Sequence, residues 1–254
     1  MASAPAQPPP SVVDATGLHY RQLNEQLLDL ARRGITDIRL EHVIGQRYIG
    51  TNLQRELRIR IEGVPGADLG AFMDGPRIEV FNNAQDACGN TMNSGRLVIH
   101  GSVGDIAGHS MRGGKLMVRD NAGYRIGIHM KEYGSKKPVV VIGGTAQHFL
   151  GEYMAGGILI VLGLQLAEGT PHPSRYIGTG MHGGVIYMRG EIEEQFTGKE
   201  VGIVPLDADD KQVLSQNIRE FGEWFGIDPE PVLRSRFTKL ISKTKRPYGR
   251  LYAY

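Results

Sequence analysis

The first stretch that could do chemistry is the glycine-rich segment 108–123, GHSMRGGKLMVRDNAG. Closely spaced glycines bind phosphate when their loop opens the N-terminus of a helix. The residues that follow, KLMVRD, are typical of a strand, so no helix is expected to begin there. We therefore interpret this segment as structural, with its glycines serving turns of the backbone.

Histidines are the next candidates for catalysis or metal binding. Five of them recur near the expected turns of the chain: His100, His109, His129, His148 and His182. No HxH or HExxH spacing occurs among them, so a metal site is not predicted. His109, His129 and His182 hold different positions in the repeat, and we expect them not to form one ladder.

Cys88 is the single cysteine of the chain, so this chain has neither an internal disulfide nor an all-cysteine metal site. We expect a buried structural thiol, because the sequence places no partner base beside it. Asp105, Asp120 and Asn121 follow expected strands and are predicted to be turn residues. The sequence thus predicts no catalytic residue, no bound cofactor and no metal ligand in this chain.

The composition narrows the class of protein. The chain has 254 residues, is 41% hydrophobic and carries a formal net charge of +2, which gives no reason to expect nucleic-acid binding. The longest apolar run, 155–164, is shorter than the ~20 residues that span a bilayer. The first residues do not resemble a signal peptide, and with the lone cysteine this leads us to expect a cytoplasmic protein.

A repeated Gly-x-x-Met spacing organises the rest of the prediction. The glycines, which we interpret as structural, are Gly70, Gly89, Gly108, Gly127, Gly151 and Gly178, and Gly50 with Leu53 is a looser copy. A period near 19 residues is too short for helix-pair repeats but suits one coil of a parallel β-solenoid. Stacked coils bury together what one coil cannot bury alone. The predicted fold is mainly β, a single-stranded parallel β-helix of about seven coils.

Each coil is expected to turn two apolar residues of its strand inward, two positions apart. The pairs are Ile59/Ile61, Ile78/Val80, Leu97/Ile99, Leu116/Val118, Val139/Val141, Leu159/Val161 and Ile186/Met188. The outward residues between them are Arg60, Glu79, Val98, Met117, Val140, Ile160 and Tyr187. Because the last five are apolar, something must cover this stripe. We favour the chain's own C-terminal helix with Phe221, Trp224 and Phe225, and a partner subunit is the alternative.

Four segments are predicted along the chain: a disordered tail (1–16), a helix and capping strand (17–44), the β-helix (45–191) and C-terminal helices with a tail (192–254). The second C-terminal helix is expected to begin at Pro229 or Pro231 and end near Lys243. Two insertions interrupt the repeat, a four-residue one within 131–138 and a longer one within 164–176. Such loops are often the binding side of a solenoid, so the expected partner contacts are Lys131, Tyr133, Lys136, His172, Arg175 and Tyr176.

The ordered glycine repeat and the phrase GEYMAGGILIVLG resemble the GXGXG domain at the C-terminal end of the glutamate synthase large subunit. The resemblance covers roughly residues 35–190. It implies a right-handed parallel β-helix that carries no catalytic residue and supports glutaminase and flavin-binding synthase domains. Those domains have no counterpart in this sequence, so the chain resembles the free-standing β-helix subunits of split glutamate synthases and of N-methylglutamate synthase.

The resemblance implies a non-catalytic scaffold subunit in a hetero-oligomer with a glutaminase-like subunit and a flavin-binding synthase subunit, where FMN and iron–sulfur clusters are expected. The same fold also occurs as the C subunit of formylmethanofuran dehydrogenase and of the related formyltransferase/hydrolase complex, which is the first alternative. A stand-alone β-helix enzyme is the second, and His109, His129 and Asp105 would be its residues to test.

Overall fold

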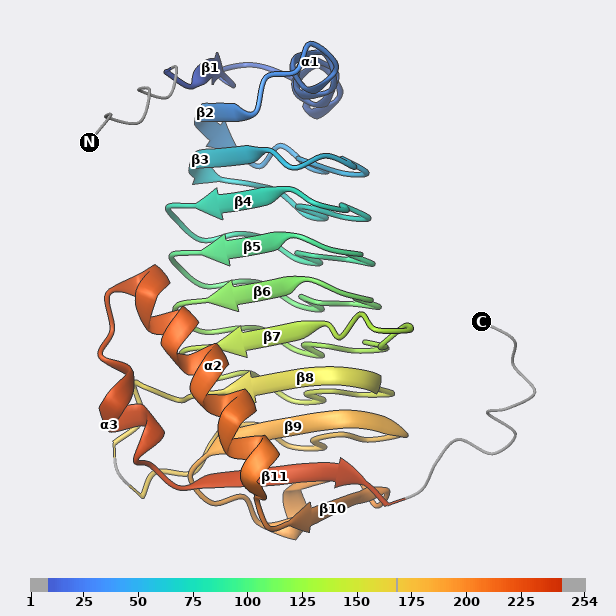
Figure 1. Cartoon of the computed structure of the whole chain (residues 1–254), viewed down its shortest axis with the longest axis vertical. Coiled ribbons are helices and arrows are strands. Elements are labelled where there is room, and N and C mark those ends of the chain that lie inside the picture. The colour runs from blue at the N-terminus through green and yellow to red at the C-terminus, as the bar shows by residue number, and fades with distance from the viewer. Residues whose placement is uncertain (1–8, 168, 244–254) are drawn as a thin grey trace, which may run out of the picture.

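The computed structural model describes residues 9–167 and 169–243, which form a tall stack of strands with a helix at one end and two helices on one side (Figure 1). The strands are β1 (Ser11–Asp14), β2 (Asp37–Ile44), β3 (Arg58–Val64), β4 (Arg77–Val80), β5 (Arg96–Ile99), β6 (Lys115–Val118), β7 (Val139–Ile142), β8 (Ala155–Val161), β9 (Gly183–Arg189), β10 (Val201–Val204) and β11 (Phe237–Ser242). The helices are α1 (Tyr20–Arg32), α2 (Ala208–Phe225) and α3 (Pro229–Leu233), with a short 3-10 helix η1 (Glu194–Phe196).

One sheet contains all eleven strands, in the order β1-β2-β3-β4-β5-β6-β7-β8-β9-β11-β10. From β1 to β9 every neighbouring pair is parallel, as a solenoid requires. The glycines of the repeat, here called the ladder glycines, lie at seven corners that enclose about six turns. The predicted fold class is confirmed, with about six turns instead of seven coils.

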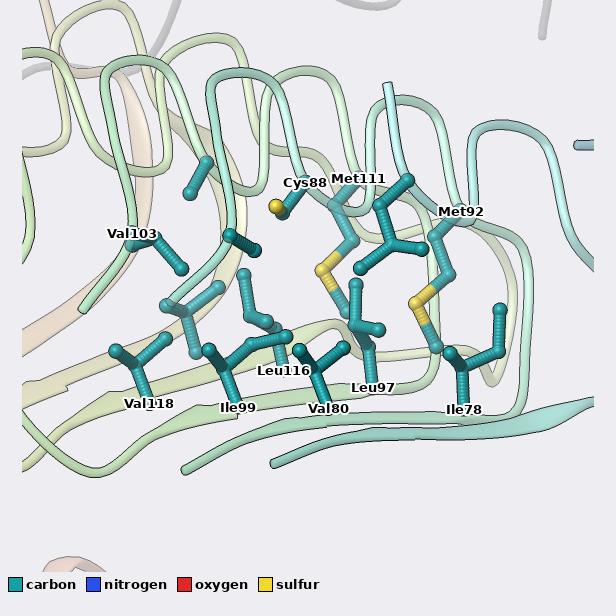
Figure 2. Close-up of a cluster of buried hydrophobic side chains, with 14 of the residues drawn as sticks. Ile78, Val80, Cys88, Met92, Leu97, Ile99, Val103, Met111, Leu116 and Val118 are labelled. Carbon is teal, nitrogen blue, oxygen red and sulfur yellow. The ribbon is translucent and has the colours of Figure 1, made fainter. Parts of the chain in front are cut away.

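The inside of the solenoid is filled by aliphatic rows that run from turn to turn (Figure 2). Leu97 and Ile99 of β5 stand in register with Ile78 and Val80 of β4, and all four are fully buried. The methionines of the repeat, such as Met92 and Met111, are also fully buried beside them. Each such side chain contributes about 1.5–3 kcal/mol on burial, so the stack is held mainly by these rows.

The predicted inward pair is wrong in one turn. Val140 and Ile142 of β7 pair with Leu116 and Val118, so they point inward, whereas Val139 and Val141 face outward. The insertion before β7 is therefore one residue longer than the four predicted. Four consecutive β-branched residues carry no alternation, so the sequence left the register of this strand undecided.

At each corner the backbone adopts the left-handed conformation at every second residue. The ladder glycine has φ between +66° and +75°, and the residues two positions before and after it also have positive φ. The amide N–H of Gly108 donates to Cys88 O of the previous turn at 2.8 Å, and that of Ser110 to Ile128 O of the next turn at 2.9 Å. Alternation of the two helical conformations thus lets one corner bond to both neighbours.

The N-terminal end is capped as expected by α1 and β2. Leu23, Leu27 and Ala31 of α1 pack onto the core, and His19 caps the helix through its side chain. The prediction of a disordered tail over 1–16 is wrong for 11–14, because β1 pairs with β2 there. Residues 1–8 of that segment lie outside the described residues.

At the C-terminal end, β11 pairs antiparallel with β9, and β10 pairs antiparallel with β11. The predicted second helix does begin at Pro229, but it ends at Leu233, and β11 occupies 237–242 instead of a helix that reaches Lys243. The predicted tail beyond Lys243 lies outside the described residues. Across the described chain, none of the helices has the length and apolar character that crossing a membrane would need.

The apolar outer stripe is covered by the chain's own α2, as predicted (Figure 1). Phe221 is almost fully buried against the strands, and Trp224 and Phe225 pack beside it. The buried hydroxyl of Tyr187 on β9 donates to the Asp210 carboxylate at 2.5 Å, which Lys239 of β11 also contacts at 2.6 Å. This polar anchor fixes the start of α2 over the sheet, and no partner is needed to bury the stripe.

Replacing two glycines of one turn tests backbone strain and steric clash separately. We predict that the two replacements lower the free energy of unfolding by different amounts. Gly89 and Gly95 both have positive φ, +71° and +98°, but a Cβ on Gly89 would meet no heavy atom closer than 3.8 Å. A Cβ on Gly95 would lie 2.2 Å from the carbonyl oxygen of Pro76. Gly89→Ala should lower the free energy of unfolding by about 1–2 kcal/mol. Gly95→Ala should lower it by about a further 1–3 kcal/mol.

Denaturant unfolding of both variants and the parent chain measures the difference. An equal loss of unfolding free energy in the two variants would show that the closeness of Pro76 O does not restrict the side chain at position 95.

Candidate functional site

A group of aromatic side chains, most of them exposed, lies on the corners of the later turns. We call this group the corner surface: Tyr124, Arg125, His129, His148, Phe149, Tyr153 and Tyr176. Tyr153 is 47% exposed and Tyr176 is 56% exposed. Tyrosine is one of the residues most enriched at protein–protein interfaces.

The rings form two stacks, one on each side of the ladder glycines. In the first stack His129 lies 5.4 Å from Tyr153, nearly parallel at 10°, and 6.0 Å from His109 of the previous turn. The second stack pairs Phe149 with Tyr176 at 5.0 Å and 15°. Each stack thus joins aromatic rings of successive turns.

The second stack also contains His148, whose ring lies 5.7 Å from Tyr124 and 6.4 Å from Tyr176. These contacts join three successive turns into one continuous surface. The expectation of no ladder is wrong for His109 and His129, since their rings meet although they are offset by one residue relative to the glycines. His182 contacts Gly180 O instead. A side chain as long as histidine spans such an offset between stacked turns.

Much of the corner surface is held in strained backbone. Arg125, His129, Phe149, Tyr153 and Tyr176 all have positive φ, between +52° and +63°. For residues other than glycine this conformation costs roughly 1–2 kcal/mol each, and glycine would remove the cost. Strained residues cluster at functional sites when the fold keeps them for their side chains. The corner surface therefore carries large side chains at positions where the backbone alone would favour glycine.

An ion pair anchors the middle of the corner surface. Arg125 Nε donates to Glu152 Oε2 at 2.8 Å, and its guanidinium lies 4.9 Å from the centre of the Phe149 ring. Glu152 is only 8% exposed, whereas the Arg125 side chain is 48% exposed, so the pair is open to solvent on its arginine side. Beside the first stack, burial and the neighbouring His129 lower the pKa of His109, whose Nδ1 lies 3.2 Å from Asn90 Oδ1.

The predicted partner contacts divide into two groups. Tyr133 is 54% exposed and Lys136 is exposed, and the two residues close a small hairpin from the first insertion. Lys131 is half-buried next to that hairpin. Tyr176 is exposed and belongs to the corner surface, and its role as a partner contact stays a prediction.

His172 and Arg175, by contrast, serve the chain's own packing. His172 is 4% exposed, and its Nε2–H donates to Arg189 O at 2.8 Å, so its prediction as a partner contact is wrong. Arg175 is half-buried over the Phe196 ring at 3.7 Å and donates to three carbonyl groups of its own loop. The second insertion folds back onto the solenoid, which the sequence alone did not indicate.

The remaining chemical candidates have structural roles. Cys88 is buried, and burial raises the pKa of its thiol to about 12, which keeps it protonated. Asp105 and Asn121 accept N–H groups of Tyr124 and Thr145 in the next turn, so they tie turns together instead of closing their own turn. Asp120 forms an ion pair with the adjacent Arg119 at 2.9 Å.

Two other histidines of the sequence prediction also make contacts within the chain. His100 Nε2 lies 2.9 Å from Glu79 Oε1, and His182 Nδ1 lies 3.3 Å from Gly180 O. Over residues 9–167 and 169–243, no three His, Cys, Asp or Glu side chains converge as a metal site would require.

Comparison with known proteins places this architecture in a family. A family model described as the GXGXG motif matches residues 24–246. The chain belongs to the GXGXG family. This is the family of the C-terminal domain of the glutamate synthase large subunit, as the resemblance of the repeat indicated. A protein of Methanocaldococcus jannaschii described as uncharacterized is 53% identical over 251 residues, and the match covers 95% of each chain.

The spacing in the family's motif matches the backbone of this GXGXG protein. The motif places glycines two residues apart, and the three positive-φ positions of each corner are also two residues apart. In this chain the middle position is glycine at all seven corners, but among the flanking positions only Gly180 is glycine. The residues of the corner surface that sequence reasoning missed could have been found by this fixed distance from a ladder glycine.

The buried His172 predicts a pH dependence of stability. Burial lowers its pKa, because its Nδ1 is enclosed without a hydrogen-bond partner while Nε2 keeps its proton for Arg189 O. The unfolded chain therefore binds more protons than the folded chain below about pH 6.5. The free energy of unfolding should fall as pH drops through that range, and His172→Gln should reduce the fall.

Thermal or denaturant unfolding of both chains between about pH 8 and about pH 5 tests this. Because the glutamine amide can still donate to Arg189 O, the replacement keeps this hydrogen bond and removes the titrating group. The two chains are compared by how steeply the free energy of unfolding of each one changes with pH. Identical slopes would contradict the assignment.

Proposed function

We propose that this GXGXG protein is a scaffold subunit, without an active site of its own, of a multi-subunit flavin-dependent complex of the glutamate synthase type. A glutaminase-like subunit and a flavin-binding synthase subunit carry out the chemistry, and those partners bind FMN and iron–sulfur clusters. Family membership supports this assignment, because the related domain supports such catalytic domains. A cytoplasmic location belongs to the same proposal and rests on the single cysteine.

The observation that carries the proposal is the corner surface. Its exposed rings are fixed by stacking and by the Arg125–Glu152 pair, so little side-chain entropy is lost when a partner covers them. Positive φ at residues other than glycine occurs at every corner of the stack, so it is the stacking of these exposed rings that supports contact with another protein.

Two further observations favour a scaffold over an enzyme. A β-helix enzyme usually gathers carboxylates or histidines on one outer face, whereas the outward stripe here is apolar and lies under α2. Iron–sulfur clusters need several cysteine ligands, and this chain has one, which is buried. These observations support the assignment of the cofactors to partner subunits.

The proposal is tested by purifying the affinity-tagged full chain after co-expression with its neighbouring genes. Mass spectrometry should identify a glutaminase-like and a flavin-binding protein. Flavin absorbance should be seen in the purified complex and be absent from the chain purified alone. A flavin spectrum from this chain alone would overturn the scaffold role. A molybdopterin-binding or amidohydrolase-like partner would instead support the formylmethanofuran-type complex.

A matched pair of variants tests the corner surface. Tyr153 and Phe72 occupy the same position after their ladder glycines, with φ of +52° and +57° and exposed fractions of 47% and 49%. Tyr153→Gly should raise the Kd for the captured partner by about tenfold or more, as expected for an interface tyrosine. Phe72→Gly, outside the surface, should leave the Kd unchanged.

Both variants should keep nearly the same free energy of unfolding, because relief of about 1–2 kcal/mol of strain offsets the lost ring contacts. Surface plasmon resonance gives the Kd, and denaturant unfolding controls for stability. Equal weakening by both variants would place the interface elsewhere.

A further inference from the structure

A second surface outside the corner surface consists of cations in register. Four consecutive strands begin with a basic residue at the same position: Arg58 of β3, Arg77 of β4, Arg96 of β5 and Lys115 of β6. We call these four residues the basic row. Neighbouring strands are about 4.8 Å apart, and like charges directly opposite each other destabilise a sheet. Anions placed close to these cations would relieve the repulsion.

The chain itself supplies an anion to one half of the row. Glu220 of α2 accepts from Arg96 Nε at 2.7 Å and also pairs with Lys115. Burial alone would raise the pKa of Glu220, but the hydrogen bonds from Lys115 and Arg96 outweigh it and lower the pKa. This carboxylate is therefore ionised and offsets the like charges of the last two strands of the row.

The other half has no carboxylate paired to it in this way: Asp37 of β2 stands next to Arg58 in the register, but its ion pair is with Arg60. Within the described part of the chain, neither Arg58 nor Arg77 forms an ion pair with a carboxylate. The Arg77 guanidinium lies 5.0 Å from the centre of the Trp224 ring, a contact that leaves its positive charge in place. Arg58, on the neighbouring strand β3, is exposed to solvent. Helix α2 ends at Phe225, just where the row loses its carboxylate.

Two adjoining grooves run along the row and share Arg77 and Arg96. One, of about 330 Å³, is lined by Arg58, Gly75 and Gly95, and the other, of about 690 Å³, by Glu220, Glu223 and Trp224. At both glycines the chain's own backbone already fills the space that a Cβ would take, so a ligand in the first groove would be held by the arginine side chains. Together the grooves form a trough that follows the basic row from α2 toward Arg58.

We propose that this trough binds an extended acidic segment of a partner polypeptide, whose carboxylates continue from Glu220 onto Arg77 and Arg58. Guanidinium groups bind carboxylates through two parallel hydrogen bonds, and the row supplies such groups on three successive strands. From Arg58 to Arg96 the row covers two strand spacings, about 10 Å, which a single small anion does not span.

An acidic peptide fits the trough better than a nucleic acid does. Glu56 and Glu223 line the same grooves and would repel an unbroken phosphate backbone. In an extended peptide, acidic side chains at every second residue point to one face, so neutral residues can pass the two glutamates. The inference does not depend on the flavin-dependent complex, because it uses residues outside the corner surface.

Trp224 makes the proposal directly testable. It is the single tryptophan of the chain and lines the trough, so its fluorescence reports occupancy without a label. The full-length chain is titrated with a peptide in which glutamate alternates with serine, and calorimetry gives the Kd. We expect a saturable change in Trp224 fluorescence and a Kd that rises with salt concentration, because the contacts are ionic.

Arg58→Ala should raise this Kd about three- to fivefold, the range for an exposed charge pair. Arg112→Ala is the matched control, since Arg112 is an exposed arginine outside the row and its removal should leave the Kd unchanged. Equal effects of the two variants, or no saturable signal, would overturn the proposal. Tighter binding of inorganic phosphate or of a single-stranded oligonucleotide than of the peptide would also overturn it.

Discussion

The fold depends on a corner that can bond to the turns before and after it at the same time. A parallel strand leaves its N–H and C=O groups to be shared with both neighbours, and the chain must then bend without losing that sharing. The corner meets this demand by placing every second residue in the left-handed conformation. Amide groups then point alternately to the previous and the next turn, as at Gly108 and Ser110. Every other feature of the molecule is added to this repeated unit.

The corner explains why glycine is both essential and unevenly used. The middle position lies against the buried methionine and aliphatic rows, where a Cβ on Gly151 would approach Ile186 Cδ1 to 2.6 Å. The flanking positions face outward and tolerate side chains at the cost of strain. Single aromatic residues such as Tyr48 and Phe72 occupy them in the first turns, whereas arginine, histidine and aromatic residues follow one another in the later turns. The rings of successive later turns contact each other and form the corner surface.

The two other surfaces follow from the regular stacking as well. A residue type repeated at one position becomes a continuous row, whatever its chemistry. Apolar residues at the outward positions of successive strands form a stripe that α2 covers. The contacts among Tyr187, Asp210 and Lys239 fix the start of that helix. Cations repeated at the strand starts gave the basic row, of which α2 neutralises one half through Glu220. A solenoid turns a short repeat into an extended binding surface in this way.

The sequence by itself determined the solenoid, its inward rows and the capping helix, because a period near 19 residues with fixed apolar positions admits few other folds. It also indicated that the outer stripe needed a cover. It did not determine the register of β7, because Val139–Ile142 carries no alternation, and only stacking on β6 decides which valines point inward. Likewise, only the tertiary structure brings His109, His129 and Tyr153 together and turns His172 inward. These contacts join residues about 20 or more positions apart, and sequence spacing within one turn does not report the offset between neighbouring turns.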